Sequence, residues 1–574
     1  MRCVKSHEKS FIFRATITKM TTDFLRLEFK KALGTLNIPV ASIDFDRPAT
    51  FYFGDYTTNF PLAFAKSRGL DPKECATKIT NALLQNKHPY IEHAEAAGPG
   101  FINIRLSRDF FIKELEAIFS NARYGSSDVL KNKKVFIEYT DPNPFKEFHI
   151  GHLLSNAVGE SVSRIVEFFG AEVKRANYQG DVGLHVAKAV WGMMHNETDL
   201  GKAYAHGAIA YEKEEQVRKE IAELNKKIYE KSDHKVNILY DLGRQKSLKE
   251  FEKIYALLGT KFDFYFFESV TGELGKKLVL EYLKKGVFHE SEGAIVFRGE
   301  ESGLHTRVFI TREGLPTYEA KELGLLKLKY DAYPYDFSII VTGNEVKEYF
   351  KVVLEAIKRM FPGMAEKATH VTHGMLRLPS GKMSSRTGDV ISAESLIDEV
   401  KKQLKDKVEK SEHLLVNKNE TLTQIVIGSI KYSILKQDAS KDIVFDFEKS
   451  ISFVGNSGPY LQYTHARCMS ILEKAKEAGI SKDVSAYTRE TPNIVRALIH
   501  FPEVVEKALK FYAPHYIATY LYELAQEFNS FYAEKQIIDK KDETSPYKIA
   551  ITSATGQVLK NGLYLLGISA PEKM

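Results

Sequence analysis

The sequence has 574 residues, of which 44% are hydrophobic and 27% are charged. This length predicts about three or four domains, and the apolar content excludes a largely disordered chain. No apolar run reaches the roughly 18 residues that a membrane-spanning helix needs. Lysine and arginine outnumber aspartate and glutamate by 81 to 75, a mild basic excess that is compatible with a polyanionic partner but does not establish one.

The cysteines, Cys3, Cys75 and Cys468, are far apart in the sequence, and no CxxC pair is present. This spacing predicts neither a disulfide framework nor a zinc site, and it fits a reducing compartment. The segment 1–20 is basic and lacks the apolar stretch of a secretory signal. It can be interpreted as a terminal tail or as an organellar transit segment, and we favour the tail.

Residues 21–120 combine helical and strand patterns. Amphipathic helices are predicted for 24–33 and within 65–84. Two glycine-containing segments, GDYTTN (54–59) and AGPGFIN (97–103), interrupt this pattern, and the second predicts a turn that leads into a strand. We interpret the region as a compact α+β domain.

The pattern changes at Lys134. The run 134–139 predicts a short strand that is apolar enough for a parallel sheet covered on both faces. A proline-rich turn follows, and then an amphipathic helix over about 151–169. Further strand-like runs, separated by helical stretches, lie at 171–176, 294–297, 337–341 and 369–372. This alternation indicates a doubly wound α/β domain.

Two parts of the chain show no strand pattern. Residues 198–258 are charged and helical, which predicts a helical insertion that is too short to form a second active site. After about residue 395 the pattern is helical and rich in aromatic residues. A helical bundle with tyrosine in its core explains most of these rings, while a few exposed rings can stack on bases.

The segment KEFHIGH (146–152) lies between the strand and the helix of the α/β domain. Ligands of an open parallel sheet bind at this place, and a helix N-terminus there attracts phosphate. His149 and His152 can donate hydrogen bonds to a phosphate, and Gly151 lets a base or ribose approach the backbone. The alternative is a capped helix start with two surface histidines.

The segment PSGKMSSRTGD (379–389) is a second candidate, a glycine-bracketed loop with two cations and several hydroxyl groups. Such a loop can move, and its lysine can neutralise a pyrophosphate leaving group. Taken alone, it is better explained as a solvated basic turn.

Together, the HIGH segment and the KMSSR loop resemble the signature pair of class I aminoacyl-tRNA synthetases. Neighbouring segments resemble arginyl-tRNA synthetases more narrowly. They are TDPN (140–143), GDVG (180–183), GPYLQYTHAR (458–467), LLGISAPEKM (565–574) and the two segments of the first domain. The resemblance extends from about residue 22 to the last residue.

The resemblance implies an α/β fold with a Rossmann-type class I catalytic domain, an α+β N-terminal domain and an all-helical C-terminal anticodon-binding domain. The expected divisions are a tail (1–20), a tRNA-contacting N-terminal domain (21–120), a catalytic domain (130–395) with the insertion at about 198–258, a connecting helical region (396–455) and the anticodon-binding domain (456–574).

The implied reaction activates L-arginine with ATP and Mg²⁺ and transfers it to the 3′ terminal adenosine of tRNA(Arg). No zinc is expected. Ser385 replaces the second lysine of the family loop, and Lys146 occupies a position where many arginyl enzymes carry a lysine, so we expect Lys146 to supply the missing charge. The expected catalytic residues are His149, His152, Lys382 and Lys146. The expected ATP-binding residues are His149, Gly151, His152, Lys382, Met383, Ser384, Ser385 and Arg386.

The resemblance also implies an arginine pocket. Asn143 and Glu268 are expected near the α-ammonium group, and Asn344 is expected to line the pocket. Tyr318 and Glu322 hold the spacing of a tyrosine and an aspartate that recognise the guanidinium in the family. Glutamate in place of aspartate moves the carboxylate by about one bond length, so the pocket must differ in shape.

The expected partners are tRNA(Arg), ATP and L-arginine, with no membrane; we expect a cytoplasmic monomer. The expected RNA contacts are Asn59, Gln462, Tyr463, Tyr520 and Met574. Two alternatives remain open: a class I synthetase for another amino acid, such as cysteine or glutamate, and an RNA-binding paralogue without activity.

Overall fold

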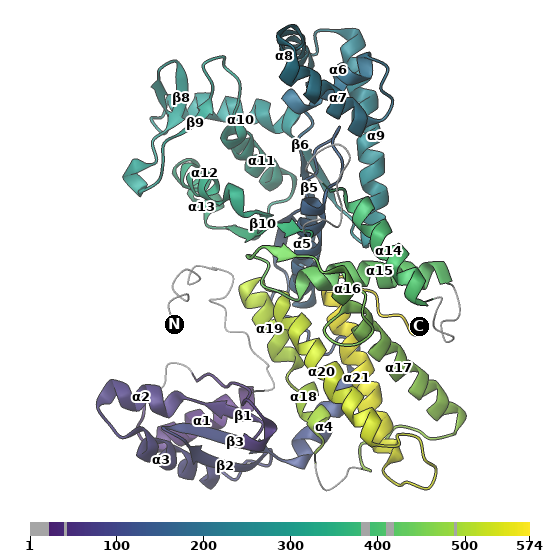
Figure 1. Cartoon of the computed structure of the whole chain (residues 1–574). Helices are drawn as coiled ribbons and strands as arrows, with labels where there is room; N and C mark the ends of the chain where they lie inside the picture. The colour runs from purple at the N-terminus through teal and green to yellow at the C-terminus, as the bar shows by residue number, and fades with distance from the viewer. Residues whose placement is uncertain (1–21, 40–42, 380–390, 409–417, 487–490) are drawn as a thin grey trace.

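The computed structural model of the chain describes residues 22–39, 43–379, 391–408, 418–486 and 491–574. The α/β domain occupies the upper part of Figure 1 and the helical region its lower right, with the N-terminal domain beside the helical region. Within the described residues, no helix is both long and apolar enough to cross a bilayer.

The centre of the α/β domain is a parallel sheet of five strands in the order β11-β10-β4-β5-β6. Val135, Phe136 and Ile137 of β4 have no exposed surface, as the sequence predicted for a sheet covered on both faces. From β4 the chain first builds β5 and β6 on one side and then β10 and β11 on the other. The carboxyl end of β4 therefore lies at the switch point, where such sheets bind ligands. The strands are β4 (Lys134–Glu138), β5 (Glu172–Gln179), β6 (Phe264–Phe267), β10 (Phe337–Gly343) and β11 (Ala368–His373).

Four of the predicted strands are confirmed in this sheet, but the prediction for 294–297 was wrong about its partner strands. This strand, β8 (Ala294–Phe297), pairs antiparallel with β7 (His289–Ser291) and β9 (Arg307–Ile310) in a separate small sheet. The small sheet lies between helices α10 and α11 in the sequence. Its phenylalanines pack with those helices in a hydrophobic cluster of their own.

The helix after β4 is α5 (Ile150–Phe168), close to the predicted range. Helices α10 (Glu268–Leu283) and α11 (Tyr318–Ala332) cross closely, since a Cβ added at Gly275 would lie 1.8 Å from the carbonyl oxygen of Ala320. The other helices of this domain are α12 (Lys347–Met360), α13 (Pro362–Ala365), η3 (Glu300–Ser302) and η4 (Asn344–Val346).

A helical arm connects β5 to β6 and forms the upper right of Figure 1. It has its own hydrophobic cluster, which includes Trp191 and Ile221. Its helices are α6 (Leu184–Met194), α7 (Leu200–Lys213), α8 (Glu215–Glu230) and α9 (His234–Leu258).

The N-terminal domain has an antiparallel sheet, and its GDYTTN segment contacts the helical region. Asp55 forms a buried ion pair with Arg496, and the Tyr56 hydroxyl donates to a Glu503 carboxylate oxygen at 2.7 Å. Both predicted helical stretches are confirmed. The elements are α1 (Asp23–Thr35), η2 (Phe51–Phe53), β1 (Tyr56–Thr58), α2 (Phe60–Arg68), α3 (Pro72–Gln85), β2 (Ile91–Ala97), β3 (Phe101–Leu106) and α4 (Arg108–Ser120).

The C-terminal region is helical as predicted, apart from the two-residue strand β13 (Ile443–Val444), which pairs with β12 (Leu376–Arg377). The expectation that strands end at residue 395 was therefore wrong in this detail. The helices are α14 (Ala393–Val408), α15 (Lys418–Leu435), α16 (Phe447–Ser450), α17 (Gly458–Glu477), α18 (Asn493–Leu498), α19 (Phe501–Phe511), α20 (His515–Glu534) and α21 (Ser545–Leu565).

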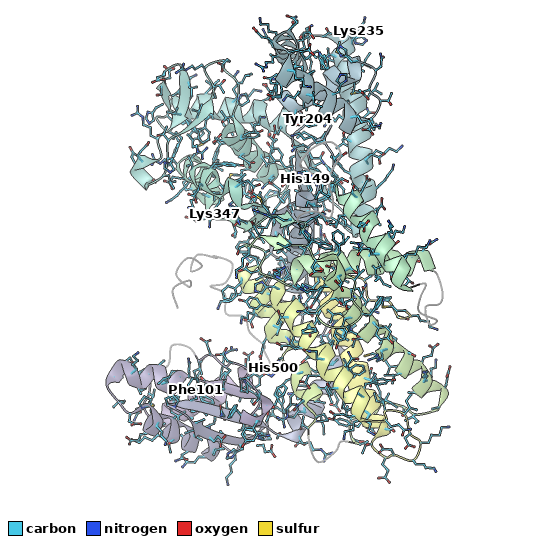
Figure 2. The ribbon with its side chains drawn as sticks, viewed as in Figure 1. Phe101, His149, Tyr204, Lys235, Lys347 and His500 are labelled. Atoms are coloured by element: carbon cyan, nitrogen blue, oxygen red, sulfur yellow. The ribbon has the colours of Figure 1, made fainter. Side chains whose placement is uncertain are left out.

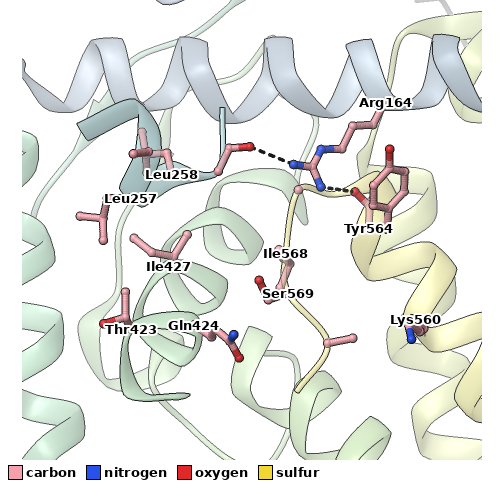
Figure 3. Close-up of a pocket in the computed structure, with 14 residues that line it drawn as sticks. Arg164, Leu257, Leu258, Thr423, Gln424, Ile427, Lys560, Tyr564, Ile568 and Ser569 are labelled. Atoms are coloured by element: carbon pink, nitrogen blue, oxygen red, sulfur yellow. Dashed lines mark hydrogen bonds between the residues drawn. The ribbon is translucent and has the colours of Figure 1, made fainter. Parts of the chain in front are cut away.

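Helix α5 is tied directly to the end of α21. Figure 3 shows Arg164 of α5 donating to the carbonyl oxygens of Tyr564 and Gly259, at 3.1 and 3.0 Å. Lys431 of α15 donates to the carbonyl oxygens of Leu258 and Gly567, at 2.6 and 2.9 Å. These two side chains therefore cap the C-terminal ends of α9 and α21, beside a pocket of about 430 Å³.

Candidate active site

The turn after β4 has an unusual backbone. Thr140, Asp141 and Phe145 all have positive φ values, of 83°, 48° and 67°, which side chains with a Cβ rarely adopt. Neighbouring elements hold the turn: the Ser155 hydroxyl accepts from the Thr140 N–H at 2.9 Å, and an Asp141 oxygen accepts from the Tyr178 N–H at 2.8 Å. Such backbone conformations cluster at functional sites.

The two histidines of the HIGH segment form a reciprocal cap on α5. His149 Nδ1 accepts from the backbone N–H groups of Gly151 and His152, at 3.1 and 3.4 Å. In return, His152 Nδ1 accepts from the backbone N–H of His149 at 3.2 Å. The rings stack with their centroids 3.5 Å apart. The helix-cap alternative is thus correct as geometry, but His152 is buried and not a surface residue.

This cap determines where the protons lie. Because both Nδ1 atoms accept hydrogen bonds, each neutral ring carries its proton on Nε2. Burial and the nearby Lys146 lower the pKa of His149, and burial with His149 and Lys146 lowers the pKa of His152 further. At neutral pH the pair therefore presents two neutral N–H donors.

Glycine is required at position 151 for a local steric reason that the sequence pattern does not reveal. A Cβ at this position would lie 2.9 Å from the His149 ring, closer than such contacts allow. A side chain would therefore displace the imidazole that caps the helix.

The residues that directly follow the KMSSR loop lie against the HIGH segment. Residues 391–393 run antiparallel to residues 148–150, and the Ala393 N–H donates to the Phe148 carbonyl oxygen at 2.8 Å. One end of the loop is therefore attached to the helix start. The predicted ATP-binding residues Lys382, Met383, Ser384, Ser385 and Arg386 lie outside the described residues.

Lys146 precedes His149 by three residues, and its positive charge lowers the pKa of both histidines. Its ammonium group is 5.2 Å from the ring centroid of Tyr204 in the helical arm, and Figure 2 shows Tyr204 above His149. Burial and the neighbouring Lys188 lower the pKa of Lys146 itself. The structure thus provides a cation next to the imidazole donors.

Asn143 and Glu268 converge on Gly180 at the end of β5. A Cβ at Gly180 would lie 2.3 Å from Asn143 Oδ1 and 3.1 Å from Glu268 Oε1. The other Glu268 oxygen, Oε2, accepts from Lys321 Nζ at 2.6 Å. Two acceptor oxygens therefore lie close together against Gly180, and an ammonium ligand needs such acceptors.

Glu322 is a buried carboxylate without a cation of its own. In the part of the chain that the structure describes, no hydrogen bond or ion pair reaches it, and it is 8% exposed. Burial and the neighbouring carboxylate of Glu138 raise its pKa well above the ordinary value, although Lys329 opposes this. Lys329 is itself paired with Glu138 at 2.7 Å. A guanidinium ligand would supply the missing positive charge.

Two other predicted residues lie in more open positions. Tyr318 is 67% exposed, at the first turn of α11. Asn344 is exposed, and its amide donates to the carbonyl oxygen of Ser440 at 2.9 Å.

The sequence analysis missed Tyr178 and Tyr349 as neighbours of the acids. Burial and Glu268 and Glu322 raise the pKa of Tyr178, and burial and Glu322 raise that of Tyr349. A tyrosine within a strand or a helix gives no signal of this proximity.

Comparison with known proteins agrees with this geometry. Residues 114–447 match the catalytic domain of class I tRNA synthetases (R), residues 23–106 the arginyl tRNA synthetase N-terminal domain, and residues 461–574 the DALR anticodon-binding domain. The chain belongs to the arginyl-tRNA synthetase family. As a class I synthetase it uses ATP.

Relatives cover almost the whole chain. An arginine–tRNA ligase of Fusobacterium nucleatum is 33% identical, over 91% of this chain and 94% of that protein. One of Clostridium kluyveri is 30% identical, over 96% of this chain and 100% of that protein. The structure of Thermus thermophilus arginyl-tRNA synthetase matches with a TM-score of 0.80 and 25% identity, covering 96% of this chain and 99% of that one. The Plasmodium falciparum enzyme shares the fold at a TM-score of 0.78 and 22% identity, covering 97% and 99%.

Within this synthetase fold, the structure corrects two of the expected RNA contacts. Gln462 is fully buried and donates to the carbonyl oxygens of Gln424 and Ser569, at 3.0 and 2.9 Å. Tyr520 is 4% exposed, and its hydroxyl donates to the Ala497 carbonyl oxygen at 3.0 Å. Both side chains are therefore part of the packing of the helical region.

The other expected RNA contacts are accessible. Tyr463 is 39% exposed, and the Arg467 guanidinium lies over its ring. Asn59 is exposed at the start of α2, and Met574 is half-buried at the C-terminus. Among the described residues, no group of three or more His, Cys, Asp or Glu side chains is arranged to hold a metal ion.

Proposed function

We propose that the chain activates L-arginine with ATP to arginyl-adenylate and transfers the arginyl group to the 3′ terminal adenosine of tRNA(Arg). One observation carries this proposal. Two neutral imidazole donors stand at the start of α5, after β4, and a buried carboxylate that lacks a cation, Glu322, lies near Glu138 at the end of β4. The first feature suits phosphate, and the second suits a guanidinium.

On the phosphate side, the Nε2–H groups of His149 and His152 donate to the ATP phosphates as negative charge grows on the departing pyrophosphate. Lys146 adds a positive charge beside them, in place of the lysine that the family loop lacks. Mg²⁺ accompanies the phosphates of the bound nucleotide. The part played by Lys382, Met383, Ser384, Ser385 and Arg386 stays a prediction.

On the amino-acid side, Asn143 Oδ1 and Glu268 Oε1 accept from the α-ammonium group, and Glu322 accepts from the guanidinium, with Tyr318 at the pocket entrance. A planar guanidinium fits a carboxylate through two parallel hydrogen bonds, which an ammonium cannot form. A buried acceptor left unpaired by the wrong amino acid costs roughly 10⁴–10⁵ in relative rate in comparable pockets. The pocket would therefore select arginine without a second, editing site.

For tRNA, the proposed division assigns the anticodon to residues 456–574 and the outer corner of the RNA to residues 21–120. The accessible residues Tyr463, Met574 and Asn59 are the candidate contacts that remain. A monomeric state and a cytoplasmic location are further predictions of the proposal.

The test is ATP–pyrophosphate exchange with each of the twenty amino acids, with and without total tRNA, followed by aminoacylation of that tRNA. Exchange and charging with arginine alone are expected. Activity with another amino acid would indicate a different class I synthetase. Tight tRNA binding without any exchange would indicate an RNA-binding paralogue.

A further inference from the structure

We propose that Lys321 is a positioning residue of the arginine site. Its ammonium group holds the Glu268 carboxylate charged and oriented, so that the second carboxylate oxygen faces the substrate ammonium beside Asn143. This inference rests on the proposed function and adds a residue to it.

The contact between the two side chains is short and shielded from water. Lys321 Nζ lies 2.6 Å from Glu268 Oε2, and the two side chains are 8% and 10% exposed. Their helices are held in register by the close α10–α11 crossing, where a Cβ at Gly324 would lie 2.0 Å from the Thr271 carbonyl oxygen. The carboxylate therefore has little freedom to rotate away from the lysine.

The same contact directs the other oxygen toward the substrate space. Glu268 Oε1 and Asn143 Oδ1 both lie close to Gly180, where an added Cβ would be 3.1 and 2.3 Å from them. Within the described residues, no hydrogen bond is made by Oε1 or by the Asn143 side chain. Lys321 thus binds Glu268 Oε2 and leaves Glu268 Oε1 without a hydrogen bond. The second acceptor without a hydrogen bond, Asn143 Oδ1, lies nearby.

Charge balance gives the lysine a second effect. Burial raises the pKa of Glu268, the charge of Asp181 adds to this, and Lys321 opposes it. An acceptor for an ammonium group must be ionised, so removal of the lysine would favour the protonated, inactive carboxyl. The titratable groups around the pair are Tyr318 and Glu322 on α11, Tyr229 on α8, Tyr178 on β5, Asp181 after β5, His185 on α6 and Tyr349 on α12.

A buried ion pair could also serve only to join two helices. The two roles differ in their effect on substrates. A helix-joining role affects arginine and ATP alike, whereas a positioning role acts only on ligands that carry an α-ammonium group.

The experiment compares Lys321→Met, Lys321→Arg and the control Lys327→Met in the full chain with tRNA present. Lys327 lies on the same helix in a solvent-exposed pair with Asp331. We expect Lys321→Met to raise the KM for arginine about 10- to 100-fold at pH 7, with an unchanged KM for ATP. Lys321→Arg should recover most of this loss, and Lys327→Met should behave as the wild type.

Two readouts separate positioning from simple support of the fold. In Lys321→Met the KM for arginine should fall as the pH rises, because the Glu268 carboxyl, whose pKa burial raises, then ionises. The inhibition constant of 5-guanidinopentanoate, which resembles arginine without its α-ammonium, should not change. An arginine KM without pH dependence, or equal weakening of the analogue, would overturn the inference. Inactivity of the wild type with arginine would instead overturn the proposed function.

Discussion

The Ala393 N–H donates a hydrogen bond to the carbonyl oxygen of Phe148, at 2.8 Å. With the hydrogen bond from the Ile150 N–H to the Ile391 carbonyl oxygen, at 3.1 Å, this contact joins the chain that follows the KMSSR loop to the residues on either side of His149. Residues 391–393 therefore lie at the helix start that carries the imidazole pair. The chain that follows the loop thus meets a segment that is distant in the sequence, as the proposed triphosphate site requires.

The double role of His149, as helix cap and as donor, can be separated by substitution. Asparagine is a strong N-cap, but its amide does not reach the place of the imidazole Nε2. For His149→Asn we expect arginine-dependent pyrophosphate exchange to fall about 100- to 1,000-fold, with the free energy of unfolding changed by about 0.5 kcal/mol or less. His149→Ala should lose activity and stability together. Wild-type pyrophosphate exchange in His149→Asn would show that the imidazole ring serves only as a helix cap.

Lys146 is expected to act through charge at the phosphates. For Lys146→Ala we expect a loss of about 10- to 100-fold in pyrophosphate exchange, and for Lys146→Arg a much smaller loss. Because Lys146 lowers the pKa of His149, its removal should also raise that pKa in an NMR titration. The control is Lys253→Ala, on the surface of α9. Normal exchange in Lys146→Ala would show that another group supplies the charge.

The structural elements that sequence patterns predicted correctly are those set by residues close together in the sequence. The strand 134–139, the helix after it and the histidine pair each depend on residues within a few positions of one another. The edge strand Phe264–Phe267 was missed, since its side chains are only half-buried and the run leads directly into a helix.

Contacts between distant segments could not be predicted. Lys321 and Glu268 are 53 residues apart and meet only because glycines let α10 and α11 cross closely. The orientation of a helical side chain posed the same difficulty: Gln462 and Tyr520 have residue types that suit RNA contacts, yet both point into the bundle. Tertiary packing determines the positions of these side chains, and it cannot be predicted from residue composition or spacing.

Glu322 should reduce stability while it supports binding. Burial raises its pKa, so the folded state keeps a proton that the unfolded chain releases above about pH 4.3. Stability therefore falls as the pH rises through this range. For Glu322→Gln we expect a gain of about 1 to 3 kcal/mol in the free energy of unfolding at pH 8, with little gain at pH 4.

The same Glu322→Gln variant should raise the KM for arginine about 100-fold, because a neutral amide cannot balance the guanidinium. Urea denaturation at the two pH values and steady-state kinetics measure both effects. Glu322→Asp is the matched variant, since it keeps the charge and moves it by one methylene. A Gln variant that binds arginine normally would exclude Glu322 from guanidinium recognition.

Arg164 connects the HIGH helix to the last helix of the anticodon domain, and its loss should be costly. Its guanidinium donates to Glu160 Oε1 at 2.7 Å and to the carbonyl oxygens of Tyr564 and Gly259. In Arg164→Ala the nearly buried Glu160 loses one partner and the two carbonyl groups lose theirs. We expect a loss of about 2 to 4 kcal/mol in the free energy of unfolding. Arg164→Lys should recover only part of it, because one ammonium group cannot reach all three acceptors.

The control for this measurement is Arg377→Ala, which breaks a pair with Asp442 whose arginine is 60% exposed. Solvent-exposed pairs contribute about 1 kcal/mol or less, so this variant should unfold almost as the wild type does. Urea and thermal unfolding of the full chain compare the variants. Equal stability of Arg164→Ala and Arg377→Ala would mean that the Arg164 guanidinium contributes nothing to the attachment of α5 to α21.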